Sequence, residues 1–209
     1  MNNDLQANQR KWDRLAARFD VMAGEGGEKR WRRAKTHLFS AMGEGDILFM
    51  ALGTGQDIAA FPAGKTLHAI DVSPKMLALA EARVASYSGT IHARQMDIHQ
   101  PSFEPASFDQ VFTSCTFCSV PNPVEGLKQV YNLLRPGGEL LMFEHTGSRY
   151  FPFNIMLRTM TFLTNKVGPD MDRDTVANVR AAGFEVTAVE NVYLDVVKII
   201  RAVRPNGEF

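Results

Sequence analysis

Cysteine is scarce in this chain, with only Cys115 and Cys118 among 209 residues. Two cysteines cannot build the disulfide framework of a small secreted domain. The sequence offers no second pair and no histidine at the spacing of a zinc site, so we expect no metal. A thioredoxin-type dithiol needs a helix that begins inside the motif, whereas the next helix is expected near Pro123. We therefore expect a reducing, cytoplasmic environment, with both cysteines as small residues at a strand end.

Long apolar runs and an excess of one charge are lacking too. No stretch approaches the roughly 20 apolar residues of a membrane span, and we expect no signal peptide. Lys plus Arg number 23 and Asp plus Glu also number 23, so the overall charge gives no reason to expect nucleic acid as a partner. Hydrophobic residues make up 45% of the chain, which indicates a single globular domain with a large core.

Basic residues are concentrated at the start of the chain. Residues 1–40 hold nine Lys and Arg against five acids. This basic start can face solvent as an ordinary helix surface, or it can make a peripheral contact with an anionic membrane. The nine residues are Arg10, Lys11, Arg14, Arg18, Lys29, Arg30, Arg32, Arg33 and Lys35.

Helices and strands are expected to alternate along most of the chain. Apolar residues at helical spacing predict two helices before Gly43. Strands are predicted at Ile47–Leu52, Thr66–Asp71, Thr90–Met96, Phe108–Cys115, Glu139–Glu144, Phe184–Val192 and Val196–Val203. Further helices are predicted at Gln56–Phe61, Ser73–Ser86, Pro123–Leu134 and Asp172–Ala182. The third of these should stop at Arg135–Gly138, because its Pro-Gly-Gly cannot continue a helix. Continuous apolar strands between helices indicate an α/β fold with a mostly parallel, doubly wound sheet, and the last two strands should be antiparallel.

A glycine turn follows the first predicted strand, at Gly53-Thr54-Gly55. An acid, Asp71, then ends the second strand. Backbone N–H groups at such a turn can approach a ligand, while a carboxylate at the neighbouring strand tip can accept both hydroxyls of a ribose. A plain structural turn, and an acid that complements a helix dipole, are the alternatives.

Two more strand ends carry polar side chains. Asp97 follows the third strand and can accept from an adenine amino group, with Met96 or Ile98 against the ring, although a strand-end Asp also suits any turn. Glu144 and His145 close the fifth strand, where an open parallel sheet meets its ligands. His145 can remove a proton near neutral pH, with Glu144 orienting it or binding a cation. Satisfaction of this pair by loop backbone is the alternative.

Residues 146–171 are too long for a simple connection and are rich in aromatic residues and methionine. They are expected to form a lid over an apolar ligand or a helix that touches lipid, with Phe151, Phe153 and Met156 facing the substrate. Packing of an extra helix into the core is the alternative.

Taken together, these motifs resemble the class I S-adenosylmethionine-dependent methyltransferases. The resemblance rests on Gly53-Thr-Gly55, Asp71-Val-Ser-Pro, Ala106-Ser-Phe-Asp109, Leu134-Arg-Pro-Gly-Gly138 and the antiparallel final strand, and it covers residues 46–204. The start, Trp12-Asp-Arg-Leu-Ala-Ala-Arg-Phe-Asp20, is similar to the helix that lies over the cofactor in the ubiquinone/menaquinone methyltransferase-like group. Cys115–Pro123, Phe143-Glu-His145 and Asp172-Arg-Asp-Thr175 are similar to a branch acting on phospholipid amines and small thiols, whose membrane-bound members carry an apolar N-terminal anchor that this sequence does not show.

The resemblance implies a Rossmann-like methyltransferase fold with S-adenosylmethionine as cofactor. Gly53, Thr54 and Gly55 would line its methionine end, Asp71 would bind the ribose, and Asp97 would reach the adenine amino group. The remaining expected contacts are Val72, Met96 and Ile98 at adenine, Ser114 and Cys115 at the methionyl part, Phe19 and Asp20 on the overlying helix, and Trp12 at the substrate.

Two positions depart from the family pattern. Phe49 stands where the family usually has an acid that helps hold the cofactor's polar end, and Ala51 stands where it has a first glycine. Asp20 is our candidate to replace the missing acid. The departures also leave open a non-catalytic protein that binds the cofactor weakly and regulates a partner. A dinucleotide-dependent oxidoreductase is disfavoured, because Ile58 occupies the position of the third glycine.

The sequence therefore predicts one methyltransferase domain in four parts. These are an N-terminal helical lid (1–43), a cofactor-binding core (44–145), a substrate lid (146–171), and a C-terminal helix with antiparallel strands (172–209). Its acceptor is expected to be small and apolar or amphipathic, with a phospholipid amine or thiol favoured and a quinol as a further choice, in keeping with a role in lipid metabolism.

Overall fold

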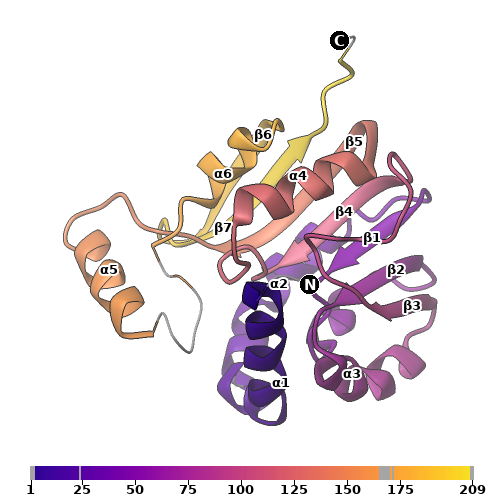
Figure 1. The fold of residues 1–209 in the computed structure, drawn as a ribbon, viewed down its shortest axis with the longest axis horizontal. Helices are drawn as coiled ribbons and strands as arrows, with labels where there is room; N and C mark the ends of the chain where they lie inside the picture. The colour runs from indigo at the N-terminus through magenta and orange to yellow at the C-terminus, as the bar shows by residue number, and fades with distance from the viewer. Residues whose placement is uncertain (1–2, 24, 165–169, 171, 208–209) are drawn as a thin grey trace.

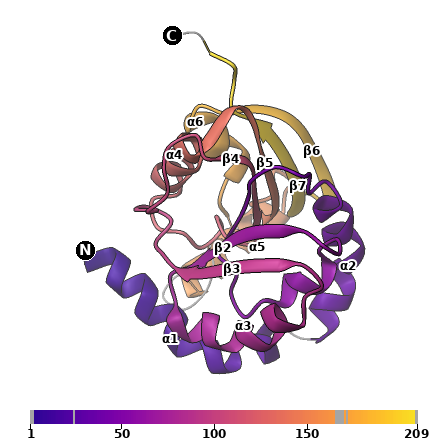
Figure 2. The ribbon, with the colours of Figure 1, turned by 90° about the vertical axis from the view of Figure 1, so that its right-hand side faces the viewer.

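A seven-stranded sheet runs through the molecule, with helices on both of its faces (Figure 1, Figure 2). The computed structural model describes residues 3–23, 25–164, 170 and 172–207. The strand order is β3-β2-β1-β4-β5-β7-β6; β1 to β5 pair in parallel, and β7 runs antiparallel to both β5 and β6. The strands are β1 Ile47–Met50, β2 Thr66–Asp71, β3 Thr90–Gln95, β4 Phe108–Ser114, β5 Leu134–His145, β6 Glu185–Tyr193 and β7 Val197–Val203. The expected mostly parallel α/β sheet with an antiparallel last strand is confirmed.

The helices divide between the two faces of the sheet and leave one helix outside both. They are α1 Asn3–Ala23, α2 Glu25–Phe39, the 3₁₀ helix η1 Gln56–Ala60, α3 Pro74–Ser86, α4 Pro123–Leu133, α5 Phe153–Thr164 and α6 Thr175–Ala181. Apolar side chains of α2, η1 and α3 pack with alternate residues of β1, β4 and β5 into one core. Those of α4 and α6 pack with the other set into a second core. Because successive strand residues point to opposite faces, one continuous apolar strand supplies both cores.

Helix α3 begins where the sequence indicates. The side chain of Ser73 accepts a hydrogen bond from the backbone N–H of Met76 at 3.1 Å, and Pro74 occupies the first helical position. A serine cap and a proline at this place stabilise a helix start. The end of β2 is thereby held at a fixed distance from α3, which positions Asp71.

Three element boundaries differ from the sequence prediction. Residues Gln56–Ala60 form a 3₁₀ helix, and α6 begins at Thr175, where Asp174 caps it by accepting from the N–H of Ala177. The helix stop predicted at Arg135–Gly138 is confirmed, because α4 ends at Leu133, but these residues also form the first part of β5, whose start is predicted at Glu139. Backbone hydrogen bonds between Gly137 and Arg204 and between Arg204 and Gly138 pair this segment with the chain that follows β7.

Helix α5 stands away from the sheet and its covering helices, at the end of a long connection from β5 (Figure 1). Exposed apolar side chains line its start, including Ile155 and Met156, while Leu157 is buried. Leu157 belongs to the core on the α2 side of the sheet, so the described side chains of α5 combine a core contact with an exposed apolar surface. Within the described part of the chain, the helices are each too short or too polar to cross a membrane.

Candidate functional site

The glycine turn after β1 has three left-handed positions within five residues. Ala51, Gly53 and Gly55 have φ values of 57°, 58° and 79°. A Cβ placed on Gly53 would meet no atom of the described residues within 4 Å, whereas one on Gly55 would come within 3.0 Å of the Ile58 side chain. Gly53 therefore borders open space that a ligand can fill, and Gly55 allows η1 to pack closely on the turn.

Asp71 is the last residue of β2 and is largely buried. Its two carboxylate oxygens accept hydrogen bonds from the backbone N–H groups of Ser73 and Gly53, each at 2.8 Å. Burial raises the pKa of Asp71 above its ordinary value, although these N–H groups act in the opposite direction. The structure thus places this carboxylate against the glycine turn, where the sequence expects the ribose of a nucleoside.

Helix α1 is held over this corner by two acids. Asp20 accepts hydrogen bonds from Thr54 Oγ1 at 2.5 Å and from Gln56 Nε2 at 2.9 Å, and it pairs with Arg83 at 2.7 Å. Partial burial alone would raise the pKa of Asp20, but the hydrogen bonds from Thr54 and Arg83 hold it below its ordinary value. Seven residues earlier on α1, Asp13 accepts from the Ser73 hydroxyl at 2.6 Å. The expected overlying helix therefore touches the residues next to both Gly53 and Asp71.

A histidine that the sequence reasoning missed holds Asp97. His99 Nδ1 lies 2.9 Å from Asp97 Oδ1, its backbone N–H donates to the same oxygen at 2.8 Å, and its Nε2 lies 2.6 Å from the carbonyl oxygen of Pro121. Both ring nitrogens face acceptors, and this arrangement favours the doubly protonated imidazole. Its hydrogen bond to Asp97 raises the pKa of His99, against the effect of burial. His99 ties the end of β3 to the loop after β4, and only the Asp-x-His spacing could have signalled it.

The other residues expected around adenine are divided between the site and the core. Met96 is half-buried, and its sulfur lies 3.2 Å from the backbone nitrogen of Ser102. Val72 is also half-buried, beside Asp71. Ile98 is buried in the core under α4, with its side chain next to Gly126. Met96 and Val72 are therefore better placed than Ile98 to meet a ring at these strand ends.

The end of β4 presents small polar side chains. The hydroxyl of Ser114 is buried without a hydrogen-bond partner, and Cys115 is exposed with a left-handed φ of 50°. Cys118 is buried, and burial raises the pKa of its thiol well above the ordinary value. Both thiols are free. Among the described residues, no group of three or more His, Cys, Asp and Glu side chains could hold a metal ion.

Glu144 is fully buried on the α4 side of the sheet. It accepts hydrogen bonds from the Thr113 hydroxyl and from the backbone N–H groups of Thr116, Phe117 and Cys118, at 3.0 to 3.4 Å. Burial raises the pKa of Glu144 to about 7 despite these donors. The carboxylate therefore holds the turn after β4 and does not orient His145, contrary to the expected pairing.

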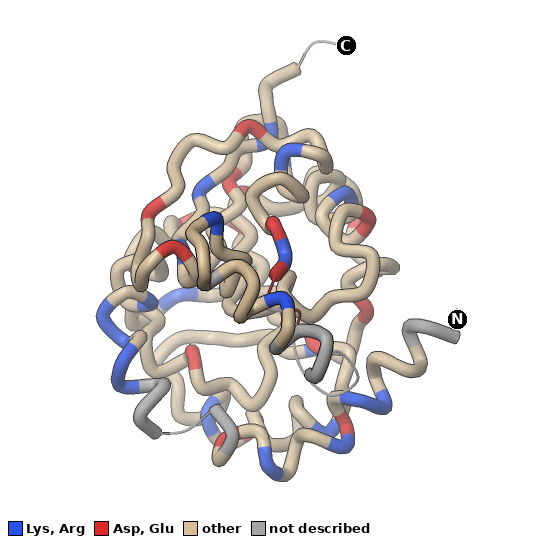
Figure 3. Tube along the Cα trace, turned by 90° about the vertical axis from the view of Figure 1, so that its left-hand side faces the viewer, with Lys and Arg blue, Asp and Glu red and all other residues tan. Residues whose placement is uncertain are grey.

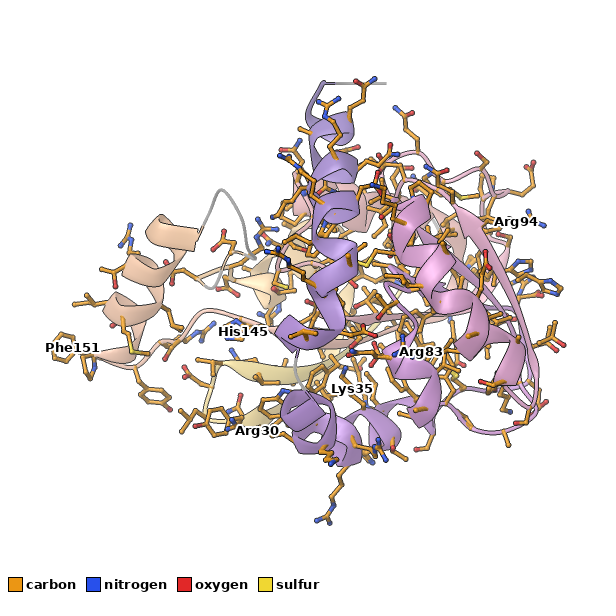
Figure 4. All side chains as sticks on the ribbon, turned by 90° about the horizontal axis from the view of Figure 1, so that it is seen from below. Arg30, Lys35, Arg83, Arg94, His145 and Phe151 are labelled. Atoms are coloured by element: carbon orange, nitrogen blue, oxygen red, sulfur yellow. The ribbon has the colours of Figure 1, made fainter. Side chains whose placement is uncertain are left out.

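His145, the last residue of β5, points to the opposite face of the sheet. Its Nδ1 is buried without a hydrogen-bond partner, and the residue as a whole is half-buried. Burial, followed by the charge of Lys198, lowers the pKa of His145. The imidazole is thus neutral at physiological pH and has a nitrogen available to accept a proton. Figure 4 shows it between α5 and α1.

An arginine outside the predicted site set links two of the site loops. Arg173 Nη1 donates to the carbonyl oxygens of Phe117 and Val120 at 2.7 and 2.6 Å. The backbone N–H of Gly147 donates to the carbonyl of Arg173 at 3.0 Å. The Asp-Arg-Asp-Thr segment noted in the sequence therefore fixes the loops after β4 and β5 relative to each other.

Phe49 replaces the family's acid and belongs to the core. It is fully buried, with its ring 5.7 Å from that of Phe39 and 5.0 Å from that of Phe61. A buried ion pair missed by the sequence reasoning lies on the same face of the sheet, where Lys35 Nζ meets Asp57 Oδ1 at 2.6 Å. The acids around the turn thus belong to α1, η1 and the end of β2 (Asp20, Asp57 and Asp71) and not to β1.

The expected substrate residues lie on two separate elements. Trp12 packs edge-on against Phe19 on α1, with ring centroids 6.1 Å apart. Phe151 and Met156 are exposed beside α5, and Phe151 points away from the body of the molecule (Figure 4). The side chain of Phe153 lies outside the described residues. Among the described side chains, Trp12 on α1 and Phe151 and Met156 thus belong to different parts of the fold.

The family profile and the relatives described here are all methyltransferases. The family profile described as "Methyltransferase domain" matches residues 48–142. The chain is 30% identical over 154 residues to the ubiquinone/menaquinone biosynthesis C-methyltransferase of Geotalea daltonii, covering 69% of this chain and 66% of the relative. It is 27% identical to the phosphatidylethanolamine N-methyltransferase of Cereibacter sphaeroides, covering 79% and 81%. It is 32% identical to the human thiol S-methyltransferase TMT1B, covering 54% and 48%.

A solved structure shows the same fold. An S-adenosylmethionine-dependent methyltransferase from Thermotoga maritima superposes with a TM-score of 0.70 at 15% identity, covering 94% of this chain and 99% of that protein. Its strands and helices therefore have counterparts along almost the whole of this chain.

Proposed function

Because the chain belongs to the S-adenosylmethionine-dependent methyltransferases, we propose that it methylates a small apolar or amphipathic acceptor. A phospholipid amine or a thiol is favoured, and a quinol is the third choice. The observation that carries this proposal is the neutral, unpartnered His145 at the mouth of β5, beside a segment with exposed apolar side chains. Relatives that act on phosphatidylethanolamine and on thiols agree with it.

The residues at the strand ends suit the cofactor. Open space borders Gly53, the buried Ser114 hydroxyl has no partner, and Asp71 and Asp97 end neighbouring strands. We assign Gly53, Thr54, Ser114 and the exposed Cys115 to the methionine end, Asp71 to the ribose, and Asp97 with Met96 and Val72 to adenine. When bound, the cofactor supplies an electrophilic methyl group on a sulfonium.

His145 acts as the general base in this proposal. An ammonium or thiol acceptor is protonated near neutral pH and becomes nucleophilic only after its proton leaves. The imidazole takes that proton on a ring nitrogen, which frees the lone pair of the acceptor's nitrogen or sulfur. Because burial lowers the pKa of His145, its basic form persists at pH values below its ordinary 6.5. Glu144 contributes by fixing the turn after β4.

The four expected parts of the chain have distinct roles in this proposal. Residues 1–43 and 146–171 cover a core formed by 44–145, and 172–209 complete the sheet. Trp12, Phe151, Phe153 and Met156 would contact the acceptor from the two covers. A cytoplasmic location, a role in lipid metabolism and contact of the basic N-terminal helices with a membrane also belong to the proposal.

Methyl transfer to phosphatidylethanolamine in mixed micelles, to a small thiol and to a menaquinol precursor would test the proposal. His145→Ala should lower kcat by roughly 10²-fold or more for amine and thiol acceptors, with the Kd for S-adenosylmethionine unchanged. His92→Ala, an exposed position on β3, is the matched control and should behave as wild type. Equal turnover of the His145 variant would remove the base assignment.

Phe49 and Ala51 support a second candidate, a non-catalytic protein that binds the cofactor and regulates a partner. The buried Phe49 provides no group for the cofactor's ammonium. Calorimetric titration with S-adenosylmethionine and S-adenosylhomocysteine separates the two functions. Micromolar binding that is lost in Asp71→Ala, together with transfer to any acceptor above, supports the enzyme. Binding without transfer to any of them supports the regulator.

A further inference from the structure

Exposed apolar side chains gather at one end of the molecule. In the described part of the chain, nine large apolar side chains are exposed, and six of them come from two short segments. We call these six the apolar end: Tyr150, Phe151, Ile155, Met156, Tyr193 and Leu194. Phe151 is 78% exposed and Tyr150 is 68% exposed. Single exposed apolar residues are ordinary on a protein surface, but such a concentration indicates a contact surface.

The two segments are tied together by the turn between β6 and β7. Asp195 accepts a hydrogen bond from the Ser148 hydroxyl at 2.6 Å and another from the backbone N–H of Arg149 at 2.7 Å. The N–H of Thr146 donates to the carbonyl of Val196 at 2.8 Å. Tyr150 and Phe151 therefore leave the body of the protein next to Tyr193 and Leu194. The apolar end is thus anchored on the sheet at its base.

Basic residues surround the apolar end. The described residues of the stretch 146–170 include Arg149 and Arg158 against a single acid, Asp170. On its other side, the guanidinium of Arg30 lies 4.1 Å from the centre of the Tyr193 ring. Arg30 belongs to α2, whose residues 29–35 include five Lys and Arg. Figure 3 faces the end of the molecule where α5 lies, and the basic residues of α2 are seen along one edge of that view.

We propose that the apolar end docks on the surface of a bilayer that contains anionic lipid. Phe151, Ile155 and Met156 would enter the boundary between headgroups and acyl chains, with Tyr150 and Tyr193 at headgroup level. Arg30, Arg149 and Arg158 would meet lipid phosphates. This goes beyond the basic N-terminus, because the apolar contact comes from α5 and the β6–β7 turn.

A bilayer suits this surface better than a second copy of the chain. A symmetric contact would bring the basic residues of two copies together, which charge repulsion opposes, whereas anionic lipid neutralises them. Docking by this end would also bring the side of the molecule that carries His145 towards the lipid (Figure 4). That last consequence rests on the proposed function, while the docking itself does not.

Vesicle flotation of the full chain tests the docking. Vesicles of phosphatidylcholine alone and of phosphatidylcholine with phosphatidylglycerol are compared. Wild type should float with the anionic vesicles, and the double variant Phe151→Asp with Ile155→Asp should bind them at least tenfold more weakly. The matched control, Val21→Asp with Leu79→Asp, changes two exposed apolar residues of α1 and α3 by the same charge and should float as wild type.

Three results would overturn the proposal. They are no flotation of the wild type, equal flotation of both double variants, and a wild-type dimer that only the Phe151/Ile155 variant converts to monomer by light scattering. Transfer to a soluble thiol without vesicles is measured in parallel. Flotation without transfer to this thiol or to either of the other acceptors named above would reject the proposed function and leave the docking intact. Transfer without flotation would support the proposed function and reject the docking.

Discussion

The imidazole of His99 and the carboxylate of Asp97 form a half-buried ion pair with Nδ1 and Oδ1 2.9 Å apart. Because Nε2 of the same ring faces the Pro121 carbonyl at 2.6 Å, the pair joins the ends of β3 and β4. Burial alone would raise the pKa of Asp97, but the hydrogen bonds from His99 hold it below its ordinary value, and the pKa of His99 is raised. Asp97, the proposed acceptor for the adenine amino group, is thus held in place by His99.

We expect His99→Ala to destabilise the fold in a pH-dependent way. A raised histidine pKa adds stability below about pH 6.5 that is lost as pH rises through the folded-state pKa. A lowered aspartate pKa adds stability above about pH 3.9 that is lost as pH falls through its folded-state pKa. The variant should therefore lose about 1–3 kcal/mol between these limits and less at alkaline pH. Urea unfolding near pH 5.5 and near pH 9 measures the difference, with His92→Ala as control. An identical loss at both pH values would show that charge plays no part.

A second pH dependence of the folding stability is expected from the buried Glu144. Its pKa is raised in the folded state, whereas that of Asp97 is lowered. Its folded-state pKa of about 7 lies above the unfolded value of about 4.3. The folded state therefore binds this proton more tightly, and stability falls by on the order of 3 kcal/mol as pH rises from 4.3 to 7. Glu144→Gln keeps an oxygen for the turn and removes the titration, so this fall should shrink.

Unfolding free energies of wild type and Glu144→Gln across that pH range test the assignment. Glu139→Gln is the matched control, because Glu139 lies on the same strand but is exposed. Parallel curves for wild type and Glu144→Gln would mean that the carboxylate is not the titrating group.

The order of the elements and the place of the site could be predicted from the sequence because both follow local rules. Apolar runs of strand length, and Ser73-Pro74 at the start of α3, each mark a boundary by chemistry within a few residues. The same local reading placed the end of α4 correctly but missed that β5 begins at Leu134 and includes Arg135–Gly138. There, Arg135 pairs with Asp46 at 2.7 Å and Asp109 at 2.5 Å, and Gly137 bonds to Arg204, so distant partners extend the strand.

The interactions that hold the site loops could not be predicted in the same way. His99 to Pro121 and Arg173 to Phe117 each join residues more than 20 positions apart, and only the packed sheet brings them together. Glu144 and His145 were assigned as one pair from their adjacency. Neighbouring residues of a strand point to opposite faces, and the structure gives them separate surroundings.

Ala51 carries a strain that can be removed. Its φ of 57° is in the left-handed region, which costs an alanine about 1 kcal/mol relative to glycine. Ala51→Gly should therefore raise the free energy of unfolding by about that amount. Ala106, with a φ of 52°, is the matched control because it precedes β4, at the far end of the strands from the cofactor site.

Thermal and urea unfolding of both glycine variants, combined with S-adenosylmethionine titration, completes this test. Both variants should be stabilised, and only Ala51→Gly should change the Kd, because only Ala51 lies in the turn. A destabilised Ala51→Gly variant would mean that the flexibility gained by the unfolded chain outweighs the relief of strain.

Asp20 can be tested as the residue that takes the place of the family's acid at position 49. Its carboxylate lies against Thr54 and Arg83, next to the open space at Gly53. If it receives the cofactor's ammonium group, Asp20→Asn should raise the Kd for S-adenosylmethionine roughly tenfold or more, since a charged hydrogen bond contributes about 1.5–3 kcal/mol.

The same helix provides the control for that experiment. Asp13→Asn weakens the bond to Ser73 and so loosens α1 as well, but Asp13 sits at the ribose corner and not at the methionine end. Comparing S-adenosylmethionine with adenosine separates the two effects. Asp20→Asn should weaken only the full cofactor, because adenosine lacks the ammonium, whereas Asp13→Asn should weaken both by the same factor. If Asp20→Asn weakens adenosine binding by the same factor, Asp20 serves to hold α1 in place. The cofactor's ammonium must then be bound by another group, such as the Asp57 carboxylate of the Lys35–Asp57 pair.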